Sequence, residues 1–297
     1  MLPTPGLPSF DYVCPASPQE VSRLLLKNAG DVRLFMGGTD VFVRMRDGFF
    51  CPRLLVDLKH LPGMTEVRYG PRTGLRIGAA VGMNTLARHP AVVTHYPMLV
   101  QALNSVASYQ LRTRATMGGN LCNASPAADT APMALVLEAN LVLHGPRGER
   151  TVPIARFFKG PGKTLLKPGE FLLRLEIPTP PKGAVGRYLK LGRNAHGDLS
   201  IVGLAAIGWP SKKVQSGYEF RLALASVAPT PIRVPEAEEI LSAAPITPEV
   251  IEWAATAAME TAQPIDDVRA SAAYRKAMVK ALTKRAVHSI LKEMGQV

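Results

Sequence analysis

In the N-terminal part of the chain, apolar and polar positions alternate as they do in a small α/β unit. Apolar residues recur at helical spacing in residues 17–31, which open with a Ser-Pro-Gln-Glu capping box and close at a glycine. Short apolar runs at residues 32–36 and 52–58 are typical of strands, and residues 41–48 between them are typical of a short helix. A strand, a glycine turn, a helix and a strand in this order predict a βαβ unit.

The pattern changes to strands and a hairpin over residues 75–177, around one helix near residues 97–107. A proline-rich stretch, IPTPPKG at residues 177–183, follows and predicts a domain boundary. Beyond it, three strands and then three helices predict a small α+β domain with a three-stranded antiparallel sheet. We therefore expect an α+β protein of two domains, residues 1–179 and residues 184–295.

The composition is that of an ordinary folded protein. Hydrophobic residues make up 47% and charged residues 20% of the chain, which excludes wholesale disorder. The N-terminus lacks the basic start and the apolar core of a secretory signal. The longest apolar stretches are interrupted by Glu138 and Asn140 and are too short to cross a bilayer. We therefore expect a cytoplasmic protein without a membrane span.

The formal net charge of +12 raises the question of a nucleic-acid partner. No RNA- or DNA-binding signature accompanies the basic residues, and aromatic residues make up only 6% of the chain. We therefore expect no nucleic-acid partner. The basic residues are scattered except on one face of the last expected helix, for which a solvated face or an acidic protein partner is the expectation. The residues of that face are Arg275, Lys276, Lys280, Lys284 and Arg285.

The three cysteines, Cys14, Cys51 and Cys122, lie far apart in the chain and form no CxxC pair. Neither a disulfide framework nor a zinc or iron–sulfur ligand set is visible at these spacings. We expect three reduced cysteines that pack in the core, and no metal site in this chain.

Two glycine pairs stand in similar settings, MGGTD at residues 36–40 and TMGGN at residues 116–120. Without Cβ atoms, the backbone N–H groups of such turns can approach a ligand, and a phosphate makes the best use of several N–H donors. The first pair also precedes the expected short helix, whose N-terminus favours an anion. Each pair alone is compatible with a plain turn, but their repetition favours a diphosphate clamped between two lobes.

Other chemical motifs are absent or incomplete. FFKGPGKT at residues 157–164 imitates a nucleotide P-loop, but Phe157 stands where that motif needs glycine, and the residues that follow predict a strand. No GxGxxG, GxSxG or HExxH occurs, and the six histidines stand in unrelated contexts. We expect no catalytic residues in this chain, so its chemistry must come from a bound cofactor.

Residues 35–48, FMGGTDVFVRMRDG, and residues 116–132, TMGGNLCNASPAADTAP, resemble a known family. That family is the FAD-binding medium subunit of the molybdenum hydroxylases, the xanthine dehydrogenase and carbon monoxide dehydrogenase group. The resemblance continues through residues 157–178, 188–203 and 272–287 and so covers almost the whole chain. It implies a two-lobed FAD-binding domain of the vanillyl-alcohol-oxidase (PCMH) type, followed by a CO dehydrogenase flavoprotein C-terminal-like domain.

The resemblance also implies which residues contact FAD. The two glycine pairs would hold the diphosphate, and Asp129 matches the family's FAD-contacting acid. Leu172 and Lys190 match contacts near the flavin ring, and Val106 matches a position that lines the pocket. The implied FAD contacts are Leu34, Phe35, Met36, Gly37, Gly38, Thr39, Asp40, Val41, Val106, Thr116, Met117, Gly118, Gly119, Asn120, Asp129, Leu172 and Lys190.

Similar proteins work beside a small subunit with two-iron two-sulfur clusters and a large molybdopterin subunit, often as a dimer of heterotrimers. The resemblance implies that this chain takes electrons from the clusters onto FAD and passes them to NAD, a quinone or another external carrier. The substrate would be oxidised at molybdenum, in the large partner subunit.

The sequence leaves the electron acceptor and two rival functions open. The chain lacks the cysteine cluster of relatives with an inserted iron–sulfur segment, and residues 192–198 lack the charged run of the xanthine dehydrogenases. The same acceptor therefore does not follow from the resemblance. One rival is a self-sufficient FAD-dependent oxidase, which needs its own acid/base groups. The other is a basic, non-catalytic binding protein.

Overall fold

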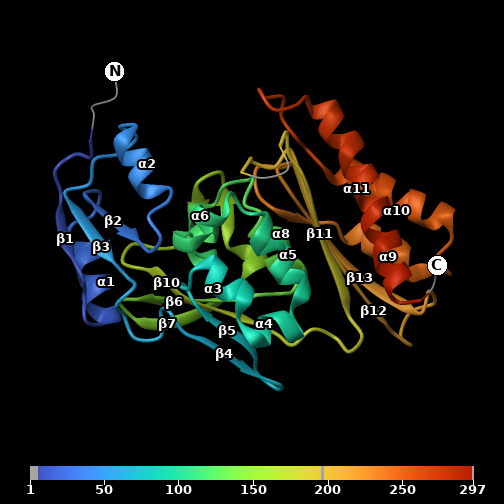
Figure 1. Ribbon diagram of the computed structural model, residues 1–297, viewed down its shortest axis with the longest axis horizontal. Coiled ribbons are helices and arrows are strands. Elements are labelled where there is room, and N and C mark those ends of the chain that lie inside the picture. Colours follow the sequence, from blue (N-terminus) through green and yellow to red (C-terminus); the bar gives the residue numbers. More distant parts are fainter. Residues whose placement is uncertain (1–5, 195–196, 296–297) are drawn as a thin grey trace.

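The computed structural model describes residues 6–194 and 197–295. Figure 1 shows three bodies side by side: a small lobe at one end, a central lobe, and a C-terminal sheet with helices on its outer face. Because the central lobe lies between the other two, it contacts both. Within the described residues, no helix is long and apolar enough to span a bilayer.

The small lobe is the βαβ unit that the sequence predicts. Its elements are β1 (Asp11–Val13), α1 (Pro18–Lys27), β2 (Val32–Phe35), α2 (Val41–Arg46) and β3 (Leu54–Asp57). The strands pair in parallel in the order β1-β3-β2, which leaves β2 at an edge. Val32 belongs to the main core, whereas Phe35 on the opposite face packs with α2. Helix α1 has the predicted cap at Ser17 but ends at Lys27, before the expected Gly30.

The central lobe is an antiparallel sheet covered by short helices. Its strands, in the order β4-β5-β10-β6-β7, are β4 (Val67–Gly70), β5 (Gly74–Gly78), β10 (Phe171–Ile177), β6 (Asn140–Gly145) and β7 (Gly148–Pro153). Its helices are α3 (Met83–Arg88), α4 (Pro90–His95), α5 (Pro97–Ser105), α6 (Tyr109–Arg114), α7 (Met117–Asn123) and α8 (Thr130–Val136). A one-turn 3₁₀-helix, η1 (Ile154–Arg156), precedes the separate ribbon of β8 (Phe158–Gly160) and β9 (Lys163–Thr164). The sequence predicted only α5 among the helices, because the others are shorter than the window in which helical spacing can be recognised.

The C-terminal domain is an α+β unit, as predicted, but its antiparallel sheet has four strands and not three. The strands are β11 (Val185–Leu191), β12 (Val202–Pro210), β13 (Tyr218–Ala225) and β14 (Ile232–Arg233), and the helices are α9 (Pro235–Ala243), α10 (Pro248–Thr261) and α11 (Ala272–Glu293). The missed strand, β14, is two residues long and stands between Pro231 and Pro235. A run that short carries no readable alternation of apolar and polar positions.

The C-terminal sheet is buried on both faces. Leu204 and Ala206 of β12 pack with the helices of the C-terminal domain, whereas Ala205 and Ile207 belong to the core of the central lobe. This double burial explains why β12 is apolar at consecutive positions instead of alternating. The sheet is therefore a wall shared by the two domains, with α5 and α8 against its inner face.

The predicted basic face of α11 is only partly solvated. Arg275 is 1% exposed, and its guanidinium donates to the carbonyls of Ile201 and Ser226 and to the carboxylate of Asp267. Lys280 and Lys284 pair with Glu252 of α10. Burial of Arg275 corrects the expectation of a solvated side chain, because helical spacing alone does not reveal which loop carbonyls a helix meets. The buried guanidinium joins α11 to the loops that follow β13 and α10.

The prediction for the cysteines was wrong in part. Cys14 and Cys51 are exposed, whereas Cys122 is partly buried and packs against the main core. All three are free thiols.

The loop carboxylate of Asp267 should make the stability depend on pH. Hydrogen bonds from Arg269, and then from Arg275, hold the pKa of Asp267 well below its usual value. A carboxyl group with a lowered folded-state pKa stabilises the fold above the unfolded-state pKa, about 3.9, and loses this contribution as the pH falls. Asp267→Asn should therefore be less stable than wild type at pH 7, and the difference should shrink below about pH 4.

Urea unfolding at several pH values measures this difference in the free energy of unfolding. The control is Glu239→Gln, which changes an exposed carboxylate of α9 and should be nearly neutral at every pH. A deficit of Asp267→Asn that stays constant from pH 7 to pH 3 would contradict the prediction.

Candidate functional site

A cavity of about 630 Å³ lies where the small lobe, the central lobe and the C-terminal domain meet. Its volume falls in the range of small-molecule sites, about 300–1,000 Å³. Residues 34–41 line it from the small lobe, and residues 197–199 line it from the C-terminal domain. The implied FAD contacts that line the cavity are Leu34, Phe35, Met36, Gly37, Gly38, Thr39, Asp40, Val41, Val106, Thr116, Gly119, Asn120, Asp129 and Leu172.

Three implied contacts, Met117, Gly118 and Lys190, are not among the described residues that line the cavity. Met117 and Gly118 are buried in the first turn of α7. The ammonium of Lys190 donates to the carboxylate of Asp129 at 2.8 Å. The side chains of Met117 and Lys190 therefore support the cavity wall from behind.

The first glycine pair forms a tight turn after β2. Gly38 has a φ of +76°, a conformation that favours glycine. A Cβ atom on Gly37 would lie 2.1 Å from the carbonyl oxygen of Arg114, so only glycine lets this turn contact the backbone of the central lobe. Within the described residues, the N–H groups of Gly37, Gly38 and Thr39 donate to no protein acceptor. They are therefore available to a ligand.

The second glycine pair, predicted as a turn, is the start of α7. The Oγ1 atom of Thr116 caps this helix by accepting from the N–H group of Gly119 at 2.9 Å. A Cβ atom on Gly118 would lie 2.5 Å from the carbonyl oxygen of Ala79, so Gly118 seats α7 against the segment after β5. Gly119 faces the cavity, where a Cβ atom would lie 3.0 Å from Thr116 Oγ1 and 3.8 Å from the terminal methyl of Met36.

The two glycine segments lie against each other. The side-chain amide of Asn123, at the end of α7, donates to Asp40 of the first turn at 3.1 Å. On the side of α7, the N–H group of Gly118 lacks a protein acceptor in the part of the chain that is described, whereas that of Met117 belongs to the antiparallel bridge between Gly82 and Thr116. Unpaired N–H donors thus flank the cavity on both sides, and such donors suit the oxygens of a diphosphate. This donor set and the cavity volume fit the dinucleotide FAD that the resemblance implies.

Asp129 connects the cavity to the C-terminal domain. Its Oδ1 atom accepts from the hydroxyls of Tyr188 at 2.7 Å and Ser200 at 2.5 Å. Its Oδ2 atom accepts from the ammonium of Lys190, which also donates to the carbonyl of Ser105 at 2.9 Å. Burial, and then the charge of Asp129, raise the pKa of Tyr188 well above its usual value, so this hydroxyl remains a proton donor. Asp129 therefore links the cavity wall to β11 through two donors and to the segment before β12 through Ser200.

Sequence reasoning missed both ends of the cavity. Arg33, Arg44 and Phe50 line its end in the small lobe, and Asp198 and Leu199 line its end in the C-terminal domain. Arg33 directly precedes Leu34, the first implied FAD contact, so extending that segment by one residue would have included it. Arg44, Asp198 and Leu199 lie in segments that carry the resemblance, but no motif marks these three residues as cavity residues. Phe50 lies outside those segments, and tertiary packing brings it to the cavity.

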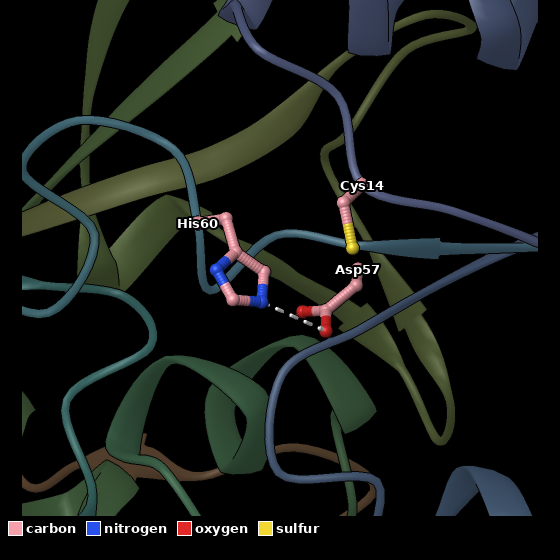
Figure 2. A group of neighbouring side chains, drawn as sticks. All are labelled: Cys14, Asp57 and His60. Carbon is pink, nitrogen blue, oxygen red and sulfur yellow. Dashed lines mark ion pairs between the residues drawn. The ribbon is translucent and has the colours of Figure 1, made fainter.

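A second group of side chains lies at the carboxyl ends of β1 and β3. Figure 2 shows Cys14, Asp57 and His60, whose ligand atoms all lie within 4.8 Å of one another. The Asp57 carboxylate already accepts from the Tyr12 hydroxyl at 2.6 Å and from the Lys59 ammonium at 2.7 Å. Burial raises the pKa of Asp57, but the hydrogen bonds from Lys59 and Tyr12 outweigh it and hold this pKa below its usual value. Because the Lys59 ammonium already pairs with the Asp57 carboxylate oxygen that a metal ion would need, we assign no metal to this group.

Comparison with known proteins supports the same cofactor. Residues 8–180 match the family described as the FAD binding domain in molybdopterin dehydrogenase, and residues 187–290 match the CO dehydrogenase flavoprotein C-terminal domain. The medium chain of carbon monoxide dehydrogenase from Hydrogenophaga pseudoflava is 33% identical over 95% of this chain and 97% of that protein. The putative xanthine dehydrogenase FAD-binding subunit of Escherichia coli is 33% identical over 91% of this chain and 92% of that protein.

Solved structures have the same fold. Carbon monoxide dehydrogenase from Hydrogenophaga pseudoflava matches with a TM-score of 0.92 and 33% identity, over 97% of this chain and 99% of that chain. Quinoline 2-oxidoreductase from Pseudomonas putida 86 matches with a TM-score of 0.89 and 29% identity, over 97% and 99% of the two chains. The predicted fold class is thereby confirmed, apart from the fourth strand of the C-terminal sheet. The chain belongs to the family of FAD-binding medium subunits of the molybdenum hydroxylases.

Proposed function

We propose that this chain holds FAD in the cavity, receives electrons from two-iron two-sulfur clusters of a partner subunit, and passes them to an external acceptor. The observation that carries the proposal is the pair of opposed glycine segments with unpaired N–H donors on both sides of the cavity. When bound, FAD supplies the redox chemistry, because it accepts electrons singly or in pairs and releases them in either way.

The residues of the chain hold and orient the cofactor. The N–H groups of Gly37, Gly38 and Thr39 would donate to the diphosphate from the small lobe, and that of Gly118 would donate from the central lobe. These donors are fixed at the end of a strand and in the capped first turn of a helix, so little ordering accompanies binding.

At the end of the cavity next to the C-terminal domain, apolar groups and buried polar groups would enclose the flavin ring. Leu172 supplies an apolar surface from β10. Asp129 and Lys190 orient the wall through their mutual hydrogen bond and through the contact of Lys190 with Ser105. Leu199 closes the cavity from the C-terminal domain. These groups exclude water from the ring and fix the polarity around it.

The partners and the domain division are part of the proposal. We infer a small iron–sulfur subunit and a large molybdopterin subunit, in a dimer of heterotrimers in the cytoplasm. We place the FAD-binding domain at residues 1–179 and the C-terminal domain at residues 184–295. The proline-rich link between β10 and β11 supports this division.

The rival functions have less support. A self-sufficient oxidase needs a free base or nucleophile in the cavity, but the three carboxylates that line it accept from protein donors: Asp129 from three, Asp198 from Arg193 and Asp40 from Asn123. Burial raises the pKa of Cys122 to about 12, so its thiol is protonated at neutral pH and is a poor nucleophile. A basic binding protein needs an open cationic face, whereas Arg275 is buried and Lys280 and Lys284 are paired.

The first prediction for this function is that FAD is bound without a covalent link. The cysteine that lines the cavity, Cys122, is held as a thiol by its raised pKa. Acid precipitation of the purified yellow protein should therefore release FAD into the supernatant, where absorbance and chromatography identify it. Flavin that stays with the washed pellet would contradict the prediction.

The second prediction concerns Gly119→Val. The added side chain would crowd Thr116 Oγ1 and the Met36 methyl group inside the cavity, and would separate the two glycine segments. Loss of two charge-assisted hydrogen bonds, about 1.5–3 kcal/mol each, weakens FAD binding by about 100-fold or more. Titration of the flavin-free protein with FAD, followed by fluorescence, measures the dissociation constant.

Gly82→Val is the matched control for this variant. Gly82, like Gly119, lies at the start of a helix, and a Cβ atom on it would lie 3.3 Å from the Thr113 carbonyl oxygen, but Gly82 does not line the cavity. The control should keep FAD affinity within a few-fold of wild type, and circular dichroism checks that both variants are folded. Equal FAD affinity of Gly119→Val and wild type would show that the diphosphate lies elsewhere.

The third prediction tests the electron-transfer role itself. The iron–sulfur subunit is reduced with dithionite, freed of the reductant and mixed anaerobically with this chain. Loss of flavin absorbance is expected within seconds, and it should not occur when the oxidised subunit is added. The chain alone should oxidise no aldehyde, purine or aromatic substrate. Substrate oxidation by the chain alone would favour the oxidase, and unchanged absorbance with the reduced subunit would refute the electron-transfer role.

A further inference from the structure

A two-stranded ribbon beside the cavity contains the segment that imitates a nucleotide P-loop. Residues 157–164, FFKGPGKT, include β8, the turn at residues 161–162 and β9. The N–H group of Gly162, in this turn, donates to the carbonyl of Ala124 at 2.9 Å and is therefore not open to a phosphate. The next elements along the chain are β9 and β10, where a P-loop needs a helix. The ribbon therefore differs from a P-loop in its N–H groups and in the element that follows.

The ribbon has a fixed position at the edge of the cavity. Phe157 at its base is fully buried, and the carbonyl of Phe157 accepts from the N–H group of Leu165 at 2.8 Å. The next residue, Leu166, lines the cavity. Ser125, which follows the acceptor Ala124, also lines the cavity. A molecule that contacts the ribbon is therefore held next to the cavity.

The outer side of the ribbon is cationic. Arg156, Lys159 and Lys163 are exposed, and within the described residues none of the three forms an ion pair. Residues 151–169 contain no Asp or Glu. Both carboxylates that flank this segment in the chain already have arginine partners, in the pairs Glu149–Arg174 and Glu170–Arg150. The three cations are therefore available to an acidic partner.

The same segment offers little apolar surface to a partner. The valine, isoleucine, leucine and phenylalanine side chains of residues 151–169 are all buried or half-buried. Permanent subunit interfaces are rich in apolar area, whereas brief electron-transfer complexes are small and depend on complementary charge. The ribbon therefore suits a brief encounter with an acidic protein better than a permanent subunit contact.

We propose that the ribbon is the docking surface of the external electron acceptor, and that this acceptor is a small redox protein with an acidic face. The inference rests on the proposed function and adds the class of the acceptor and the residues that meet it. Arg156, Lys159 and Lys163 attract the acidic face and hold it beside the cavity. One fully reduced FAD gives up two electrons and two protons. A one-electron carrier takes one electron in each of two encounters, and the protons go to the solvent.

Other classes of acceptor fit this surface less well. The diphosphate of NAD needs converging N–H donors, but the Gly162 N–H group already has an acceptor. A quinone is neutral, so it gains nothing from the charges of Lys159 and Lys163. An acidic protein also responds to the formal net charge of +12, because the field of the whole chain steers it toward the surface.

The first test needs no variant. The FAD-loaded chain is photoreduced, and its oxidation by an acidic b-type cytochrome or a basic c-type cytochrome is followed by stopped-flow absorbance. The second-order rate constant for the acidic cytochrome should fall at least about tenfold between about 20 mM and about 500 mM NaCl, because salt screens the attraction. The rate constant for the basic cytochrome should not fall. A rate constant for the acidic cytochrome that is independent of salt would overturn the inference.

Charge reversal locates the docking surface. Lys159→Glu and Lys163→Glu should each lower the rate constant for the acidic cytochrome about 3- to 10-fold at low salt, and the difference should vanish at about 500 mM NaCl. The matched controls, Lys212→Glu and Lys213→Glu, make the same change of charge on exposed residues between β12 and β13 of the C-terminal domain. They should stay within about twofold of wild type. FAD content and circular dichroism check that all four variants are folded.

The outcomes separate this inference from the proposed function. If the ribbon variants and the controls slow the acidic cytochrome equally, the ribbon is not the docking surface. If NAD or a water-soluble quinone oxidises the reduced flavin faster than the acidic cytochrome does, and equally in wild type and the ribbon variants, the acceptor class is wrong. If the ribbon variants slow the reduction of the flavin by the iron–sulfur subunit, the ribbon belongs to the donor interface and the inference is overturned. In these three cases the proposed function stands, whereas a wild-type chain that binds no FAD would refute the function itself.

Discussion

The site depends on two places where one backbone lies directly against another. A Cβ atom on Gly37 would lie 2.1 Å from the Arg114 carbonyl oxygen, and a Cβ atom on Gly118 would lie 2.5 Å from the Ala79 carbonyl oxygen. Only glycine permits these approaches. The first brings the small lobe onto the segment before α7, and the second seats α7 on the central lobe. Together they fix the distance between the unpaired N–H groups of the two lobes. Gly37 and Gly118 thus set the width of the cavity through contacts within the protein, and Gly37, Gly38 and Gly119 line it.

The C-terminal domain completes the cavity because its sheet has no free face. Alternate residues of β12 pack with its own helices and with α5 and α8 of the central lobe. The inner face also carries Tyr188 and Lys190, whose polar ends meet at Asp129. Apolar packing against this sheet therefore holds the two domains together, and the buried carboxylate of Asp129 fixes the position of the sheet. Leaving that carboxylate without its donors would cost several kcal/mol, so the wall has one preferred position over the cavity.

The sequence predicted what depends on local pattern. The βαβ unit, the glycine segments, the cap at Ser17 and the order of the C-terminal strands and helices all follow from neighbours in the chain. It missed what depends on tertiary contact: the two-residue β14, the short helices of the central lobe, the burial of Arg275, and Arg33 and Phe50 at the cavity. These features have no periodicity of their own. Arg275 reads as a surface cation until the loop that carries Asp267 folds against it.

The polar groups around the cavity are held in place by the protein itself. The backbone N–H donors lie at a strand end and in a capped helix turn, and each of the three carboxylates, Asp40, Asp129 and Asp198, accepts from a protein donor. Fixed dipoles need little reorganisation when charge arrives at a bound group or leaves it. A subunit that receives electrons from one protein and gives them to another carrier benefits from such rigid surroundings, because motion of side chains at each step would slow both transfers.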